Sequence, residues 1–357
     1  MERALTLLRE LVEIESPTYS PGVRAVAERV ARELQALGAR VDVLEGDHLV
    51  AQLDGRGEPL LLLGHTDTVW PLGTLERMPF RVGGGRAYGP GAYDMKGCLV
   101  LLLEAIRLAG DGRRPLRVFL TADEEMGSRS GRPHIERAAA GVAAALVVEP
   151  PTPDGHLKTA RKGLARFRLA VTGRAAHAGT HREHGVSAIE ELAHQVLALQ
   201  ALNDERRGVS VNVGVVRGGT SENVVPAEAE ALVDVRVATR RDMARVERAL
   251  RALRPALAGT TLELGGGWTR PPLEPTPTSR RLFEAAREHG RALGLELEAG
   301  SSGGGSDGNL VAALGVPVLD GLGVEGGGAH APDEHVLLAS LPVRARLLAA
   351  LLCSPGV

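Results

Sequence analysis

Three short apolar runs constrain the fold of this chain more than any other feature of its sequence. They are EPLLLLGH (58–65), LRVFLTA (116–122) and AALVVEP (144–150). Runs that are nearly continuous rather than alternating are typical of strands buried on both faces of a parallel sheet. Helical periodicity at 21–38 and 95–110 predicts helices before and between them. An α/β sandwich with a mainly parallel sheet is therefore expected, with a half-exposed strand where RVDVLEG alternates.

The pattern changes between about residue 162 and residue 267, where the predicted strands become one-sided. Strands are predicted at 161–173, 209–216, 229–238 and 261–266, and helices at 186–202 and 241–257. The order βαββαβ suits a small, ferredoxin-like α+β domain with two helices on one face of its sheet. A Pro-rich linker follows, and then helices and apolar strands such as VPVLDG resume. We predict an α/β domain of residues 1–163 and 268–357, interrupted by an inserted domain of residues 164–267.

Composition excludes several classes of protein. The 357 residues are 44% hydrophobic and 24% charged, with a formal net charge of −2, which argues against nucleic acid as the main partner. Two cysteines, Cys98 and Cys353, make neither a disulfide framework nor a thiolate metal site. No apolar run approaches the roughly 20 residues of a membrane span, and the amphipathic start MERALTLLRELVEIES does not resemble a signal peptide. A cytoplasmic protein without a membrane partner is expected.

Polar side chains gather where the apolar runs end. TADEEMGS places Asp123, Glu124 and Glu125 side by side directly after one buried strand. The other strand and loop ends contribute further candidate ligands: His65 and Asp67, Asp94, Glu149, and far downstream His330. Functional residues of open parallel sheets collect beyond the carboxyl ends of the strands. The acids of TADEEMGS therefore either form a solvated loop or surround something positive.

Each of these residues has an ordinary structural alternative when it is taken alone. A single histidine is more often a satisfied structural residue, and an acid at a strand end more often caps a helix or faces water. Five independent strand or loop ends that supply two histidines and three carboxylates favour a pair of divalent ions instead. This mixture of ligands favours zinc, with cobalt or manganese as substitutes. Because neighbouring residues on an extended segment point opposite ways, one of Glu124 and Glu125 can bind metal while the other faces the attacking water.

The combined motifs resemble the M20 family of zinc metallopeptidases, and within it the glutamate carboxypeptidase branch. The resemblance rests on GHTDTVWPLGTLERMPFRVGGGRAYGPGAYDMKG, DEEMGS, VVEP, AAHAG, GGGSDG and GGGAHAPDE, which occur in that order over nearly the whole chain. It implies a zinc-binding α/β domain that carries an inserted dimerisation and lid domain, two zinc ions per subunit and a homodimer.

The resemblance also implies a role for each candidate residue of the metal site. Asp94 matches a carboxylate that bridges both ions. His65 and Glu149 match the other protein ligands of one ion, and Glu125 and His330 those of the second. Glu124 matches the general base, and Asp67 matches an acid that orients the ligating histidine.

Further residues match the substrate side of the family's site. His177 matches a histidine of the inserted domain that polarises the substrate carbonyl in the partner subunit. Asn223 and Arg236 match substrate contacts, and Arg236 is predicted to lie on the strand face opposite Val233, Val235 and Val237. Arg270 matches a residue that binds the free carboxylate of the substrate. The glycine-rich segment with Gly305 and Ser306 is expected to contact substrate through its backbone.

These matches imply a di-zinc hydrolase that cleaves an amide or peptide bond of a small peptide or N-acyl amino acid. PLGTLERMPFRV favours the carboxypeptidase branch over a biosynthetic deacylase of the acetylornithine or succinyl-diaminopimelate type. A non-catalytic binding protein on the same scaffold is a further alternative. It predicts the loss of a metal ligand or of Glu124, and the sequence retains them all.

Overall fold

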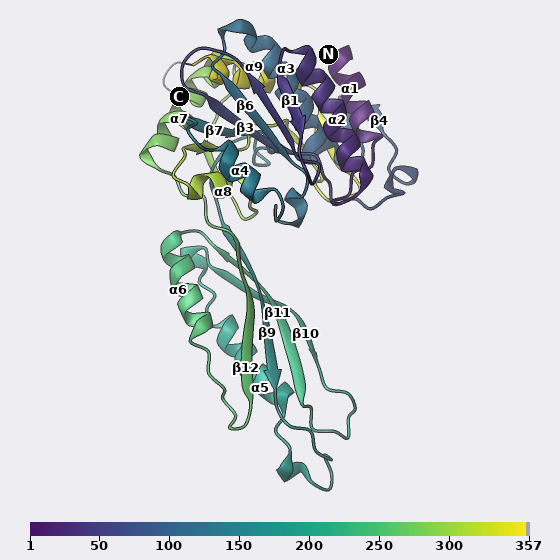
Figure 1. The fold of residues 1–357 in the computed structure, drawn as a ribbon, viewed down its shortest axis with the longest axis vertical. Helices are drawn as coiled ribbons and strands as arrows, with labels where there is room; N and C mark the ends of the chain where they lie inside the picture. Colours follow the sequence, from purple (N-terminus) through teal and green to yellow (C-terminus); the bar gives the residue numbers. More distant parts are fainter. Residues whose placement is uncertain (355–357) are drawn as a thin grey trace. The chain divides into compact units, whose positions relative to one another are not determined.

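The computed structural model describes residues 1–354, and its chain divides into two compact units (Figure 1). The larger unit comprises Met1–Ala160, Glu274–Ser302 and Ser306–Val357, and the smaller comprises Arg161–Leu273 with Gly303–Gly305. The last three residues of the predicted 268–357 segment lie outside the described part of the chain. No helix within residues 1–354 has both the length and the apolar character that a membrane span requires.

The larger unit is built on a six-stranded sheet whose centre is parallel. Its strand order is β1-β2-β6-β3-β7-β14. The bounds are β1 Arg40–Val43, β2 Leu49–Leu53, β6 Leu116–Thr121, β3 Leu60–His65, β7 Ala144–Val147 and β14 Val318–Leu319. Strand β3 pairs in parallel with β6 and β7, and β14 pairs in parallel with β7. The mainly parallel sheet is thus confirmed, and among the six strands of this sheet only the antiparallel strand β2 was not predicted.

The three apolar runs are buried on both faces, as predicted. Leu60 and Leu62 of β3 join the main core with side chains of the surrounding helices, whereas Leu61 and Leu63 point to the other face and are equally buried. The helices of this unit are α1 Glu2–Val12, α2 Pro21–Ala36, α3 Gly97–Ala109, α4 Arg132–Ala138, α7 Pro277–Ala292, α8 Asp307–Ala313 and α9 Ser340–Cys353. Helices α3 and α9 pack against each other, and α4 packs against α8. Burial of apolar surface on both faces fixes the central strands within the unit.

Short strands complete the larger unit and lead to the site. A four-stranded antiparallel sheet has the order β15-β16-β5-β4, with β15 Gly326–Gly327, β16 His335–Leu337, β5 Arg86–Tyr88 and β4 Arg81–Gly83. Strands β8 Leu157–Arg161 and β13 Ala299–Ser302 form a separate pair. The turn that carries Asp94 follows β5, and the loop that carries His330 joins β15 to β16. The small sheet therefore brings two distant sequence segments together.

The smaller unit has the predicted βαββαβ order and a ferredoxin-like sheet, β10-β11-β9-β12, which is antiparallel throughout. Its elements are β9 Gly163–Thr172, α5 Ala188–Gln200, β10 Ser210–Gly218, β11 Glu228–Val237, α6 Arg240–Arg251 and β12 Thr261–Arg270. One face is apolar and packs against α5 and α6, through Phe167, Leu169, Val233, Leu192 and Val246 among others. Arg236 lies on the opposite face from Val233, Val235 and Val237, as the alternation predicted.

Candidate metal centre

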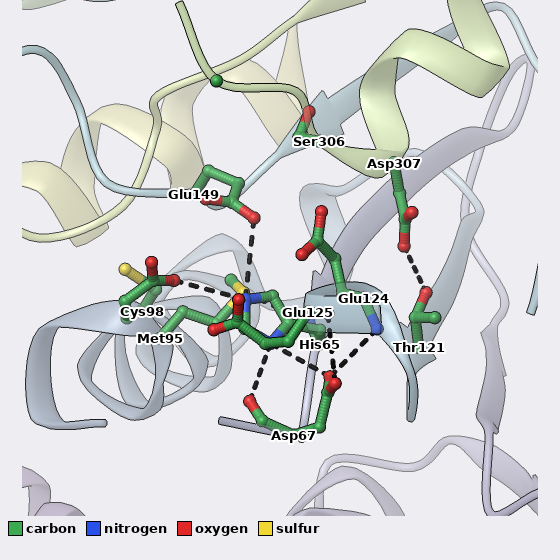
Figure 2. A network of polar contacts seen from close by, with 12 residues as sticks. His65, Asp67, Met95, Cys98, Thr121, Glu124, Glu125, Glu149, Ser306 and Asp307 are labelled. Carbon is green, nitrogen blue, oxygen red and sulfur yellow. Dashed lines mark hydrogen bonds and ion pairs between the residues drawn. The ribbon is translucent and has the colours of Figure 1, made fainter. Parts of the chain in front are cut away.

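The first group of candidate metal ligands lies at the carboxyl ends of two parallel neighbours, β3 and β7. Because Leu63 pairs with Val147 in this register, His65 at the end of β3 and Glu149, two residues after β7, lie level with each other. His65 Nε2 lies 3.6 Å from Glu149 Oε1 (Figure 2). It lies 3.2 Å from Asp94 Oδ1. The three donor atoms lie within 4.8 Å of one another, which is close enough to share one ion. Parallel pairing thus brings together residues far apart in sequence.

The second group comprises Asp94, Glu125 and His330, and it shares Asp94 with the first. His330 Nε2 lies 3.5 Å from Asp94 Oδ2 and 3.4 Å from Glu125 Oε1. One oxygen of Asp94 therefore faces His65 while the other faces His330. This is the arrangement that a carboxylate needs in order to contact two ions at once.

The donor set fits a pair of divalent cations. Two imidazoles and three carboxylates are ligands suited to zinc and its first-row neighbours. Glu125 Oε1 is buried and has no hydrogen-bond partner among residues 1–354. A buried carboxylate oxygen without a partner is costly, and a cation beside it removes that cost.

The two histidines of the site bind protons more tightly than a free imidazole, because carboxylates lie beside them. The neighbouring carboxylates of Asp94 and Glu125 raise the pKa of His330 to about 10. Burial alone would lower the pKa of His65, but hydrogen bonds with Asp67 and Asp94 raise it well above its usual value. Burial alone would raise the pKa of Asp94, yet hydrogen bonds with His330 and His65 lower it. Because metal ligation needs deprotonated imidazoles, protons and metal ions compete for these ligands.

Asp67 connects the first ligand to the acidic turn. His65 Nδ1 lies 2.9 Å from the Asp67 carbonyl oxygen and 3.3 Å from its carboxylate, which leaves Nε2 directed at Asp94 and Glu149. The Asp67 carboxylate also accepts hydrogen bonds from the backbone N–H groups of Glu124 and Glu125, both at 3.1 Å. Such outer contacts orient the ligands of a metal site.

Glu124, the predicted general base, and Glu125, a predicted metal ligand, lie on the same turn. Glu124 and Glu125 lie on a short 3-10 turn, Glu124–Met126, directly after Asp123. Figure 2 shows their side chains diverging from this turn, with Glu125 toward His65. Both are half-buried, so Glu124 combines access to water with closeness to the ligands.

One residue that positions the site was missed by the sequence reasoning. Glu334 is buried and accepts hydrogen bonds from the backbone N–H groups of Gly91, Tyr93 and Asp94 and from Trp70 Nε1. Burial raises the pKa of Glu334 to about 7, against the opposing effect of these hydrogen bonds. Its carboxylate thus shapes the turn that presents Asp94. The only sequence signal was its place within GGGAHAPDE, four residues after His330.

Within the smaller unit, the structure pairs two of the predicted substrate residues. The segment of His177 lies beside that of Asn223, through a bridge between His177 and Val224 and a 3.0 Å hydrogen bond from Ala178 N to Asn223 O. His177 Nδ1 accepts hydrogen bonds from the N–H groups of Gly179 and Thr180. Nδ1 must therefore be the unprotonated nitrogen, which leaves Nε2–H as a donor on an exposed ring.

Two arginines of the smaller unit border the glycine-rich segment. Arg236 donates hydrogen bonds to Asp234 and, at 2.8 Å, to the carbonyl oxygen of Gly303. Arg270 is buried, and a Cβ added at Gly305 would lie 2.8 Å from its Cδ atom. A side chain at position 305 would therefore displace Arg270.

Ser306 belongs to the larger unit and is fully buried. Its hydroxyl donates to Asp320 Oδ2 at 2.6 Å and accepts a hydrogen bond from Gly308 N, so that it caps α8. The side chain of Ser306, a predicted substrate residue, thus stabilises the start of α8.

A third set of possible ligands, which the sequence analysis did not single out, is an exposed group on the smaller unit. His181, Glu183 and His184 approach one another within 4.8 Å. Their side chains are 66–73% exposed, and no buried framework of the described residues fixes them. We therefore assign them no site.

Two histidines and three carboxylates at the carboxyl edge of an α/β sheet are typical of metal-dependent hydrolases. Comparison with known proteins places the chain within that class. The profile of Peptidase family M20/M25/M40 matches residues 61–354, and the chain belongs to this family. It is a family of hydrolytic enzymes, as the sequence resemblance implied.

Similar proteins cover nearly the full chain. Carboxypeptidase G2 from Pseudomonas sp. (strain RS-16) is 32% identical over 98% of this chain and 88% of its own length. Human Aminoacylase-1 is 29% identical over 99% of this chain and 96% of its own length. The crystal structure of the M20 family metallo-carboxypeptidase Sso-CP2 from Sulfolobus solfataricus has the same fold, with a TM-score of 0.80 at 18% identity, and the match covers 99% of both chains.

Proposed function

We propose that the protein is a di-zinc hydrolase that cleaves an amide or peptide bond and releases a C-terminal or N-acylated amino acid. The position of Asp94, with one carboxylate oxygen toward His65 and the other toward His330, is the observation that supports this most directly. His65, Asp94 and Glu149 would hold one ion, and Asp94, Glu125 and His330 the other. When bound, such ions supply Lewis acidity, which acidifies the attacking water and polarises the scissile carbonyl.

The remaining chemistry falls to side chains of the protein. Glu124 takes the proton from the attacking water and returns it to the leaving amine nitrogen, the task of a general base that later acts as an acid. Asp67 keeps His65 and the Glu124 backbone in place through its hydrogen bonds. His177 donates from Nε2 to the developing oxyanion, and a donor of this kind contributes roughly 3 kcal/mol to the transition state.

Carboxypeptidase activity is the first form of this proposal, and N-acyl amino acid hydrolysis is the second. The similarity to Carboxypeptidase G2 supports the first, and that to Aminoacylase-1 supports the second. Both need an anchor for the free carboxylate of the substrate, for which Arg270 is the candidate. The two differ only in the group on the other side of the scissile bond.

A substrate panel with purified, metal-loaded protein tests the proposal. It contains dipeptides and N-acyl amino acids with acidic, basic and apolar C-terminal residues, assayed with added zinc or cobalt. We expect turnover that a chelator abolishes and that zinc or cobalt restores. A protein that binds no divalent ion and hydrolyses no member of the panel contradicts the proposal.

We further propose a homodimer formed through the smaller unit. Strand β10 lies at the edge of its sheet, and Val215 and Val216 on it are exposed, as are Ile189 and Leu197 on α5. An edge strand with exposed apolar side chains is a ready pairing surface. A dimer built this way would let one subunit present His177 to the site of the other.

Complementation between inactive variants tests this arrangement. Co-expression of His177→Ala with Glu124→Ala subunits is expected to restore about one quarter of wild-type activity, because half of the dimers are mixed and each mixed dimer has one intact site. The measurement is kcat per subunit, with a sedimentation experiment for the oligomeric state. A fully active monomer, or a mixture as inactive as its parents, contradicts the shared site.

Substitution of Arg270 tests the carboxylate anchor. A guanidinium binds a carboxylate through two parallel hydrogen bonds that lysine cannot copy. Arg270→Lys is therefore expected to raise KM by about tenfold or more for substrates with a free α-carboxylate and to spare their amidated analogues. Kinetics on matched acid and amide substrates measure the difference.

Arg161→Lys is the matched control for Arg270→Lys. Arg161 is also a buried arginine of the smaller unit, and it donates to the carbonyl oxygens of Gly304 and Gly305. This variant should affect both substrate types equally. Equal losses on both types with Arg270→Lys would show that Arg270 supports the protein rather than the substrate.

A further inference from the structure

Residues 121–128, which carry Glu124 and Glu125, are hydrogen-bonded at both ends to one buried carboxylate, that of Asp307. Thr121 Oγ1 donates to Asp307 Oδ2 at the start of the segment (Figure 2). Ser128 Oγ donates to Asp307 Oδ1 at its end. All three side chains are buried. A charged acceptor strengthens hydrogen bonds of this kind, and burial shields them from water.

The conformation of the segment needs such support. Ser128 has φ +52°, in the left-handed region that residues with a Cβ rarely adopt. The turn closes through hydrogen bonds of 2.8 Å from Gly127 N to Glu124 O and from Ser128 N to Asp123 O. Asp67 holds the N–H groups of Glu124 and Glu125 from another side, so that two buried acids restrain the turn.

Asp307 is the first residue of α8, where an acid could simply favour the helix N-terminus. That helix is already capped, because Ser306 accepts a hydrogen bond from Gly308 N and Asn309 accepts one from Ser306 N. Both oxygens of Asp307 are directed instead at the segment 121–128. The placement favours a role toward this segment over a role in capping.

We propose that Asp307 is a positioning residue for the reaction, which fixes the turn so that Glu124 keeps its place beside the metal ligands. Because Asp307 follows Ser306 directly, it also joins the end of the glycine-rich segment to the base-bearing turn. The proposal rests on the proposed function for the role of Glu124. Its structural half, that Asp307 orders residues 122–128, holds whatever the substrate is.

The test removes one hydrogen bond to Asp307 without changing charge. Thr121→Val is expected to lower kcat by about tenfold, with KM and metal content within about twofold of wild type, because small misplacement of a catalytic group slows the reaction strongly. Thr121→Ser retains the hydroxyl and should restore kcat. Asp307→Asn, which alters both hydrogen bonds, should have the larger effect.

A matched control separates positioning from loss of stability. Thr260 Oγ1 donates to Glu191 Oε2, also a buried hydroxyl on a buried carboxylate, but in the smaller unit. Thr260→Val should lower the unfolding temperature as Thr121→Val does, with kcat unchanged. Hydrogen exchange of metal-free protein gives a second readout, in which backbone amides of residues 122–128 should exchange faster in Thr121→Val only.

The outcomes distinguish this inference from the proposed function. Wild-type kcat in Thr121→Val, or exchange in residues 122–128 equal to that of wild type, overturns the role of Asp307. If the wild-type protein hydrolyses no member of the substrate panel, the proposed function fails, and hydrogen exchange still decides whether Asp307 orders the turn. If Asp307→Asn does not fold, the same measurements are made on Thr121→Val and Ser128→Ala, each of which removes one of the two hydrogen bonds.

Discussion

Replacing Glu124 by alanine is expected to lower kcat by about 10²-fold or more and to leave both metal ions bound, because a general base contributes on that scale. Glu124 lies on the ligand-bearing turn but belongs to neither group of candidate ligands that the structure brings together. Steady-state kinetics and metal analysis of the same preparation measure the two quantities. Loss of turnover without loss of metal identifies a base rather than a ligand.

The neighbouring residue supplies the comparison. Glu125→Ala removes a carboxylate from the second ligand group and should lower metal content as well as kcat. If Glu124→Ala turns over nearly as fast as wild type, the base is elsewhere. If it loses metal as Glu125→Ala does, the two acids have exchanged roles.

Replacing Asp94 by alanine is expected to have the second large effect, the loss of both ions and of all measurable turnover. Asp94 is common to both ligand groups, whereas Glu149 belongs to one. Asp94→Ala should therefore reduce bound metal to well below one ion per subunit, and Glu149→Ala should remove only one of the two. Metal analysis of gently purified protein near pH 8 checks this, because lower pH protonates the ligands.

Two results would contradict the shared ligand. Asp94→Ala protein that retains one tightly bound ion would show that its carboxylate serves a single ion. Equal metal loss in Asp94→Ala and Glu149→Ala would contradict the expectation that Asp94, unlike Glu149, serves both ions. The unfolding temperatures of both variants in chelator, where bound metal adds no stability, show whether each variant is folded.

Much of the fold followed from local pattern. The strands β3, β6 and β7 were predicted because aliphatic runs buried on both faces leave few other structures for their backbone. The smaller unit was predicted because the alternation of Phe167 and Leu169 in β9 with exposed residues marks a one-sided strand. Strand β2 was missed, since Leu49–Leu53 is short and stands between turns. Its pairing with β6 is a long-range contact that no local pattern contains.

The ligand types of the candidate site were predictable from the sequence, but the hydrogen bonds that hold the ligands in place were not. Acids and histidines after buried strands indicated ligands, because strand ends of a parallel sheet meet at one edge. Asp307 belongs to the motif GGGSDG, in which the glycines suggested the function, yet its carboxylate contacts a turn 179 residues earlier in the chain. Glu334 likewise serves backbone N–H groups some 240 residues away. Side chains that hold a site in place from outside it have no characteristic sequence spacing to the residues they contact.

By itself, the sequence determined which residue types this protein has for binding metal and which strands present them. Aliphatic runs, alternation and the polar residues that end them are local, and burial acts on each run in the same way wherever it lies in the chain. The tertiary structure alone decided which oxygen of Asp94 faces which histidine, and that Asp67, Asp307 and Glu334 hold the ligands in place. Those contacts depend on distances of a few ångströms between segments far apart in the chain, which only the packed sheet and its helices define.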